Sequence, residues 1–422
     1  MEPIAVRKRI LHVVMVVASS AAGFALVVTP PAAPAQNNTA PFTATPIASP
    51  AGAKANSSEP QFTVQGDRVI LSWIEGGDEH PALRFAERTA TGWTPAQTAH
   101  AGTEMNVNAV DLPSVQLLAN GTLAAQWTEK NGPDPEATKV RLSWSSNQGK
   151  MWSAPVTPHR DGTQTEHSFV SLFQAPGAAA GTGVVWIDGR ATAGKGEGQA
   201  DMALRSSIYD ATGKQLGETV LDPRVCECCS TAAATTSEGV IVAYRDRSPR
   251  EIRDIYVTGY NGTAWSTPVL VHADNWQING CPINGPAVSA RGRDVAVAWF
   301  TAKNDEGHSF VAFSHDAGRT FGQAVRVDSQ KSLGHVGVQM LADGSAVVSW
   351  MELAGSSAEF RARKVTAAGV PSPVVNVAGK GDPDTRSPRI AGKATELLFA
   401  WTESDENDVE HVRVARAALA AK

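Results

Sequence analysis

Residues Val140–Pro155 read VRLSWSSNQGKMWSAP, and this stretch decides the fold. Apolar and polar residues alternate up to Trp144, which is the pattern of a strand with one buried face. Turn residues follow at Ser145–Gly149, and the chain resumes an apolar pattern at Trp152. In such a turn the short polar side chains bond back to the turn's own backbone, while the following aromatic ring packs beneath it. The stretch therefore predicts a tight β-hairpin.

The same turn pattern returns further along the chain. Ser314–Phe321 reads SHDAGRTF and places Ser, Asp, Gly and an aromatic residue at the spacing of Ser145, Asn147, Gly149 and Trp152. The two segments resemble Asp-boxes, the hairpin repeats of sialidase-type β-propellers. This resemblance implies a propeller whose Asp-boxes are structural and lie on the face opposite the ligand site. Two unrelated hairpins are the alternative interpretation.

A second repeat runs through the whole chain, and it is a β-rich segment that ends in an aromatic residue followed by charged or polar residues. The seven aromatic positions are Trp73, Trp127, Trp186, Tyr244, Trp299, Trp350 and Trp401. A period of about 50 residues with strand patterning is typical of a propeller in which each repeat is one four-stranded blade. We therefore predict an all-β propeller of seven blades. Sialidases have six blades, so six is the alternative count, and a pair of β-sandwiches is the rival architecture.

The N-terminal region has the composition of a targeting segment. Arg7–Arg9 precedes an uncharged, mostly apolar run, Ile10–Val28, and then a stretch rich in Pro and Ala. This pattern is typical of a signal peptide, or of a membrane anchor if it is not cleaved. We expect a leader over residues 1–35, a linker over 36–58 and the propeller over 59–420. The protein is then exported, to the periplasm, the cell surface or the medium.

The linker and the overall charge allow two further expectations. The last repeat shows three strands, and Phe42–Ser49 in the linker could supply the fourth and close the ring. The formal net charge is −5, which provides no basic face for nucleic acid. We therefore expect no nucleic-acid partner, and contact with a membrane only through the N-terminal segment.

Propeller geometry gathers the unusual residues on one face, because the loops that lead into the innermost strands crowd around the axis. These loops carry four cysteines and two histidines: Cys226, Cys228, Cys229, Cys281, His167 and His335. Exported proteins usually oxidise an even number of cysteines, so Cys228 or Cys229 could bond to Cys281 and join two neighbouring blades. One alternative is a Cu or Zn site built from these cysteines and histidines. The other is one disulfide together with one reactive pair.

The same face carries many arginines, and four of them lie within the charged run Tyr244–Asp254. That run is either a solvated loop of exposed ion pairs or a site that binds a carboxylate or phosphate bidentately. The sialidase resemblance implies an arginine cluster, an acid and a tyrosine nucleophile. The candidates for ligand binding are Arg190, Arg245, Arg247, Arg386 and Asn284, and those for catalysis are Asp188 or Asp111 as the acid and Tyr244 as the nucleophile.

Two departures from the sialidase pattern leave the activity open. The first blade has Glu59–Pro60–Gln61 where the family has an arginine, and the last blades contain no tyrosine. The leading hypothesis is an exported sialidase-like propeller whose axial face binds or hydrolyses a glycan or another anionic ligand. The alternative is a non-hydrolytic periplasmic propeller with an axial metal or redox site of Cys and His. A non-catalytic interaction scaffold is the third possibility.

Overall fold

The computed structural model describes residues 40–419, apart from 54, 109, 178–180, 197, 356, 382–387 and 394. These residues belong to the compact unit Asn38–Lys422, and the expected leader over residues 1–35 lies outside the described residues. In this part of the chain no helix has the length and apolar character needed to cross a membrane. Its helical elements are the 3₁₀ turns η1 (Arg190–Thr192) and η2 (Lys303–Asp305).

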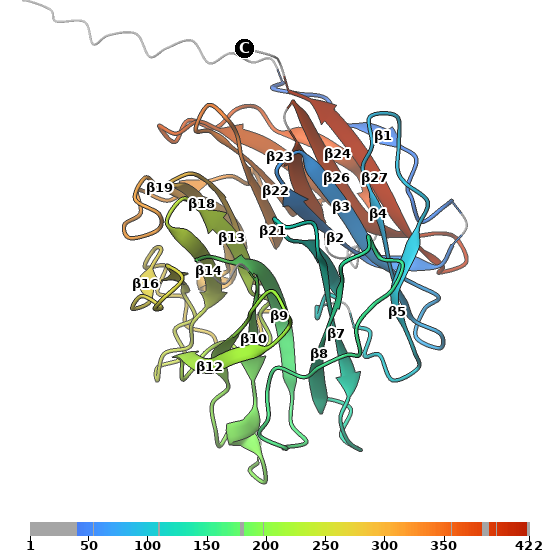
Figure 1. Cartoon of the computed structure of the whole chain (residues 1–422). Helices are drawn as coiled ribbons and strands as arrows, with labels where there is room; N and C mark the ends of the chain where they lie inside the picture. The colour runs from blue at the N-terminus through green and yellow to red at the C-terminus, as the bar shows by residue number, and fades with distance from the viewer. Residues whose placement is uncertain are drawn as a thin grey trace, which may run out of the picture. The chain divides into compact units, whose positions relative to one another are not determined.

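The strands form seven antiparallel sheets, which we call blades 1 to 7 (Figure 1). Blade 1 contains β2 (Ser57–Gln65), β3 (Arg68–Glu75), β4 (Ala82–Glu87) and β5 (Gln97–Ala101). Blade 2 contains β6 (Ser114–Leu117), β7 (Leu123–Lys130) and β8 (Thr138–Ser145), and a bridge from Leu142 to Val156 stands at the place of a fourth strand. Blade 3 contains β9 (His167–Ala175), β10 (Gly181–Asp188), β11 (Ala203–Tyr209) and β12 (Gln215–Asp222).

The remaining blades continue the same order. Blade 4 contains β13 (Ala232–Thr236), β14 (Gly239–Arg245), β15 (Ile255–Tyr260) and β16 (Val269–Leu270). Blade 5 contains β17 (Ala287–Arg291), β18 (Asp294–Thr301), β19 (His308–Ser314) and β20 (Val325–Arg326). Blade 6 contains β21 (Ser332–Met340), β22 (Ala346–Ala354), β23 (Ser357–Val365) and β24 (Val375–Gly381). Blade 7 contains β25 (Arg389–Lys393), β26 (Glu396–Ser404), β27 (Glu410–Ala418) and β1 (Thr45–Ile47). The prediction of an all-β, seven-bladed propeller is confirmed, and the alternative count of six blades is wrong.

Blade 7 takes its outermost strand from the other end of the chain. Within the segment expected to close the ring, β1 pairs antiparallel with β27, so that Thr45 lies opposite Arg416 (Figure 1). Phe42, just before β1, is buried and stacks on Phe399 with ring centroids 6.0 Å apart. The backbone N–H of Val412 also donates a hydrogen bond to the side chain of a serine in β2. β1 therefore completes blade 7 as its outermost strand and covers the edge of β27, and the Val412–Ser57 hydrogen bond ties this blade to blade 1.

The repeated aromatic residue of each second strand lies in the core. Where it is tryptophan, its indole N–H gives a reason for the acidic residue two positions later. A buried indole N–H needs an acceptor. Residues two apart in a strand share one face, so a carboxylate two positions later can accept that hydrogen bond. Four blades use this arrangement: Trp73 with Glu75 at 3.3 Å, Trp127 with Glu129 at 3.0 Å, Trp186 with Asp188 at 2.8 Å and Trp350 with Glu352 at 3.0 Å.

An arginine on the third strand completes this group in the same four blades. Arg84, Arg141, Arg205 and Arg361 lie directly opposite the four tryptophans. Their guanidinium nitrogens approach the carboxylates to between 2.9 and 3.7 Å. The acids that follow the aromatic residues are therefore part of the blade structure, where they satisfy a buried indole and pair with an arginine.

The two hairpin turns fold as their side chains predict. The Ser145 hydroxyl accepts the N–H of Gly149 at 2.9 Å, and Oδ1 of the Asn147 side chain accepts the N–H of Met151 at 2.9 Å. Ser314 and Asp316 make the equivalent bonds in the second turn. Gly149 has φ +86°, and a Cβ there would lie 2.4 Å from the ring of Phe85 in blade 1. The turn of blade 2 is thus packed directly against its neighbour.

Candidate functional site

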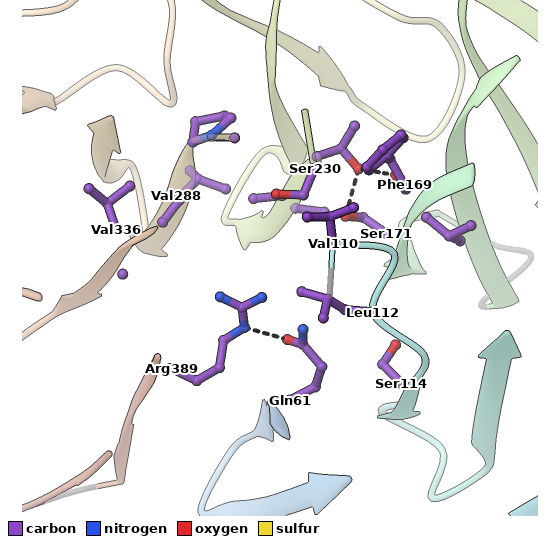
Figure 2. Close-up of a pocket in the computed structure, with 18 of the residues that line it drawn as sticks. Gln61, Val110, Leu112, Ser114, Phe169, Ser171, Ser230, Val288, Val336 and Arg389 are labelled. Carbon is purple, nitrogen blue, oxygen red and sulfur yellow. Dashed lines mark hydrogen bonds between the residues drawn. The ribbon is translucent and has the colours of Figure 1, made fainter. Parts of the chain in front are cut away.

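The innermost strands of the blades enclose a cavity of about 260 Å³ on the propeller axis. All seven blades contribute residues to its lining, as expected for a closed ring (Figure 2). Its hydrogen-bonding side chains include Gln61, Ser114, Gln116, Ser171, Ser230 and Asn284. Among the described lining residues, Arg389 is the sole Arg or Lys, and none is Asp, Glu or Tyr. The described part of the cavity wall therefore offers one permanent cation among neutral residues, several of which can form hydrogen bonds.

Arg389 opens blade 7 and points into this cavity. Its Nε donates a hydrogen bond of 2.9 Å to Oε1 of Gln61 from blade 1, and Figure 2 shows both side chains reaching toward the middle of the pocket. Burial lowers the pKa of Arg389 to about 10, against the opposing effect of Glu59, so the group stays charged at neutral pH. Burial and the charge of Arg389 lower the pKa of the cavity residue His335 to about 4, so this imidazole is neutral there.

Strained backbone surrounds the cavity. Phe169 and His335 lie in the innermost strands with φ of 55° and 50°, a left-handed conformation that is costly for residues other than glycine. In each case a side chain from the preceding blade accepts the backbone N–H of the strained residue. Asp111 accepts the N–H of Phe169 at 3.0 Å, and the Asn284 side chain accepts the N–H of His335 at 2.8 Å. Asp111 and Asn284 thus fix the direction in which lining residues enter the cavity.

The four cysteines gather where the loops before blades 4 and 5 meet. Cys228 and Cys281 form a disulfide with Cα atoms 6.0 Å apart, which links the loops before two neighbouring blades. Cys226 and Cys229 remain thiols, and their Sγ atoms are 2.6 Å apart. The structure therefore matches the mixed arrangement of one disulfide and one dithiol pair.

The Cys226 thiol has an unusual electrostatic environment. Burial opposes ionisation, but the Cys229 thiol, Arg245, the backbone N–H of Cys228 and Arg253 outweigh it and lower the Cys226 pKa to about 7. Arg253 is itself buried and donates from Nη1 to Sγ of Cys226 at 3.3 Å. Burial and the neighbouring Cys226 raise the pKa of Cys229. Cys226 is thus the thiol of the pair that ionises first.

The three described arginines of the predicted cluster, Arg190, Arg245 and Arg247, do not line the cavity. Arg245 is 1% exposed, and all its hydrogen bonds go to backbone carbonyls. Arg247 donates to the carboxylate of Glu251 and reaches Glu227. Arg190 pairs bidentately with Asp188 at 2.7 Å. These arginines have internal partners, and Arg386 lies outside the described residues.

The predicted catalytic residues are also engaged away from the cavity wall. Both carboxylate oxygens of Asp188 accept hydrogen bonds from Arg190, and one of them also accepts the indole N–H of Trp186. The hydroxyl of Tyr244 donates to Asp222 at 2.7 Å, and burial raises the pKa of this tyrosine. Asp111 is 2% exposed, and burial raises its pKa to about 6 although Thr128 and backbone N–H groups oppose this shift.

The six predicted metal ligands do not form one site, because the four cysteines lie together while His167 belongs to a different cluster. His167 packs beside His159 with ring centroids 3.7 Å apart, and both rings approach a carboxylate oxygen of Asp161 within 3.3 Å. The Nε2 lone pair of His159 accepts the N–H of Val140, which uses one of the possible ligand atoms. His335 lines the axial cavity. The sulfur of Cys228 is bound in the disulfide and cannot act as a thiolate ligand in this state.

Sequence reasoning missed Arg389, Gln61, His159 and Asp161. Arg389 and Gln61 belong to the innermost strands, and the repeat pattern already placed those strands at the axis. Polar residues in these innermost strands could therefore have been identified from the sequence as residues that line the axial cavity. His159 and Asp161 lie in the loop between blades 2 and 3, and no repeat position marks them.

No protein-family model matches the chain, and no curated protein matches it in sequence. Solved structures do share its architecture. A protein of unknown function from Dyadobacter fermentans is 13% identical, with a TM-score of 0.51 over 87% of this chain and 96% of that one. The polysaccharide lyase Uly1 is 12% identical, with a TM-score of 0.51 over 87% and 91%. The endosialidase of phage phi92 is 8% identical, with a TM-score of 0.50 over 90% of this chain and 70% of that one. The chain therefore shares a fold with propeller proteins that include a polysaccharide lyase and an endosialidase.

Proposed function

We propose that the protein is a propeller that binds an acidic glycan, with one sugar residue in the axial cavity and Arg389 as the contact for its carboxylate or sulfate. Among the described lining residues Arg389 is the sole permanent cation, and its place in a wall without Asp or Glu carries this proposal. A guanidinium can hold a carboxylate with two parallel hydrogen bonds. Gln61, Ser114 and Ser230 line the same cavity and offer donors and acceptors for sugar hydroxyls. The shared fold with a polysaccharide lyase and an endosialidase supports a glycan as the ligand class.

The size and chemistry of the cavity favour binding over hydrolysis. Its volume of about 260 Å³ is near the lower limit of small-molecule sites, roughly 300 to 1,000 Å³, and suits one sugar residue. Glycoside hydrolysis uses a pair of carboxylic acids, or a tyrosine as the nucleophile. The described lining contains neither kind of side chain.

Replacing Arg389 with glutamine is expected to weaken binding of an acidic sugar by about tenfold or more, because a charge-assisted hydrogen bond is lost. Titration calorimetry with glucuronate, N-acetylneuraminate and neutral glucose measures this. Arg416→Gln is the matched control, since Arg416 belongs to the same blade and its side chain is 57% exposed. Equal affinity for glucose and glucuronate, or unchanged affinity in Arg389→Gln, would contradict the proposal. Release of free sugar from acidic oligosaccharides would replace binding with hydrolysis.

We also propose that the protein is exported. The charged and apolar N-terminal pattern supports this, as does the Cys228–Cys281 disulfide, because disulfides persist mainly in oxidising compartments. Cell fractionation should recover the full chain outside the cytoplasm, and a variant without residues 1–35 inside it. Equal distribution of the two proteins would contradict export by this segment.

A further inference from the structure

Four sulfur atoms beside the axial cavity are connected by successive contacts, from Cys229 to Cys226, from Cys226 to Cys228, and through the disulfide to Cys281. Sγ of Cys226 is 3.9 Å from Sγ of Cys228, which is bonded to Cys281. The same Cys226 sulfur is 2.6 Å from Sγ of Cys229. A reduced pair and an oxidised pair are therefore adjacent, and Cys226 contacts both.

We propose that these cysteines form a thiol–disulfide relay, which moves two electrons from the buried Cys226–Cys229 pair to the Cys228–Cys281 disulfide and so presents thiols that reduce a disulfide in a partner. Disulfides exchange when a thiolate attacks a disulfide sulfur and the other sulfur leaves. The attacking sulfur of Cys226 contacts both the sulfur that it attacks, Cys228, and the second thiol, Cys229. This activity is independent of glycan binding at Arg389.

Each step of the relay is balanced within the chain. The Cys226 thiolate attacks Sγ of Cys228, the Cys228–Cys281 bond breaks, and Cys281 leaves as a thiolate that takes up the proton lost from Cys226. Cys229 then loses its proton and attacks Sγ of Cys226. The Cys226–Cys228 bond breaks, and Cys228 leaves with the electron pair and a proton. The product has a Cys226–Cys229 disulfide and thiols at Cys228 and Cys281.

The partner reaction returns the second pair to its starting state. The Cys281 thiolate attacks one sulfur of a partner disulfide, and the other partner sulfur leaves as a thiolate and is protonated. Cys228 then attacks Cys281 and re-forms the Cys228–Cys281 bond, which releases the partner as a dithiol. Before another cycle an external dithiol donor reduces the accessible Cys228–Cys281 bond. The two internal steps, run in reverse, then pass these electrons to the Cys226–Cys229 bond.

The cysteines at the start of the relay are buried, and the one that reacts with the partner is exposed. Cys226 and Cys229 are 0% and 1% exposed, so external disulfides cannot reach them directly. Cys228 is partly buried and lines the axial cavity, while Cys281 is exposed on the loop that precedes β17. The electron store is therefore enclosed, and the reacting sulfur is at the surface.

Charged groups support the assignment of Cys226 as the first nucleophile. Arg253 donates to its sulfur, Arg245 lies close enough to act on it, and Glu227 pairs with Arg253 at 3.0 Å. The pKa of about 7 makes a substantial fraction of Cys226 thiolate near neutral pH. Nucleophilic attack needs this ionised form.

Trapping with iodoacetamide under native, non-reducing conditions tests the internal steps. Peptide mapping without reduction is expected to find the label on Cys281 and Cys228, together with a Cys226–Cys229 bond, although these labelled residues are disulfide-bonded at rest. Cys229→Ser should stop after the first step and show the label on Cys281 with a Cys226–Cys228 bond. Cys226→Ser should slow labelling of Cys281 by about tenfold or more, because it removes the attacking thiolate.

A small aromatic disulfide, dithiodipyridine, tests the partner reaction. The native wild-type protein is expected to release two thiopyridone molecules per chain and to finish with both disulfides formed, whereas Cys226→Ser should react at least about tenfold more slowly. Absence of thiols in the denatured protein would mean two permanent disulfides and would overturn the relay. Labelling of Cys226 and Cys229 with an intact Cys228–Cys281 bond would overturn it too, as would bound Cu or Zn that protects the thiols.

Discussion

Replacing Arg245 with methionine is expected to lower the free energy of unfolding by about 5 kcal/mol, since each buried acceptor left without a donor costs about 1–3 kcal/mol. The guanidinium donates to the carbonyls of Asn284, Arg253 and Phe300 over distances of 2.6 to 3.0 Å. It also lies over the ring of Trp276 at 5.1 Å. Methionine fills a similar volume but offers no hydrogen to any of the three carbonyls. Urea unfolding followed by tryptophan fluorescence measures the loss.

Arg250→Met is the matched control, because Arg250 belongs to the same charged run but is exposed. Exposed substitutions usually change stability by about 0.5 kcal/mol or less. A similar small change in Arg245→Met would show that its carbonyl partners find other donors. Retained stability combined with lost binding of an acidic sugar would instead restore Arg245 as a ligand contact.

The Asp111→Asn variant is expected to be more stable than the wild type at pH 8 by up to about 3 kcal/mol and equally stable near pH 4. Burial raises the pKa of Asp111 from 3.8 to about 6 in the folded protein. Between these two values the folded state binds more protons than the unfolded state, so wild-type stability falls as pH rises. Asparagine stays neutral and can keep bonds to Phe169 and Thr128, so it should lack this decline. Urea unfolding at a series of pH values measures the difference.

Neighbouring groups and a second aspartate make this pH test specific. Burial raises the pKa of Glu166 to about 7, and Asp111 contributes to that shift, so Asp111→Asn relieves both residues in the same direction. In Asp316 the bonds from Thr320 and Ser314 outweigh burial and lower the pKa to about 2. Asp316→Asn should therefore lose stability relative to the wild type above pH 4. Parallel pH curves for the wild type and Asp111→Asn would contradict the assignment.

The fold was predictable because its determinants are local and repeated. The turn at Ser145–Trp152 is stabilised by hydrogen bonds between its own residues. The seven evenly spaced aromatic positions indicate the number of blades. The closing strand was also predictable, because the last repeat shows three strands and Phe42–Ser49 in the N-terminal linker could supply the fourth. Each of these signals depends on residues that are close together in the sequence or on a constant period.

The site was less predictable because charge in a sequence does not show its partners. In the sequence, Asp188 and the other acids after the tryptophans could serve as ligand-binding or catalytic groups. In the structure they accept hydrogen bonds from the indole N–H groups, because residues two apart in a strand lie on the same face. Arg245 looked like an anion contact, but its partners are carbonyls from blade 5 and from the loops beside it. Arg389 and Gln61 are 328 positions apart, and they meet only because the ring closes.

The pairing of β1 with β27 also constrains the order in which the molecule can assemble. Thr45 can pair with Arg416 only after the chain has been synthesised to that point, 371 positions later. Strands within the other blades pair over short sequence separations. Contacts between distant residues form slowly, because chain entropy opposes them until the intervening segments are in place. During synthesis β1 is therefore made first but pairs last. Blade 7 is completed only after the rest of the propeller has been synthesised.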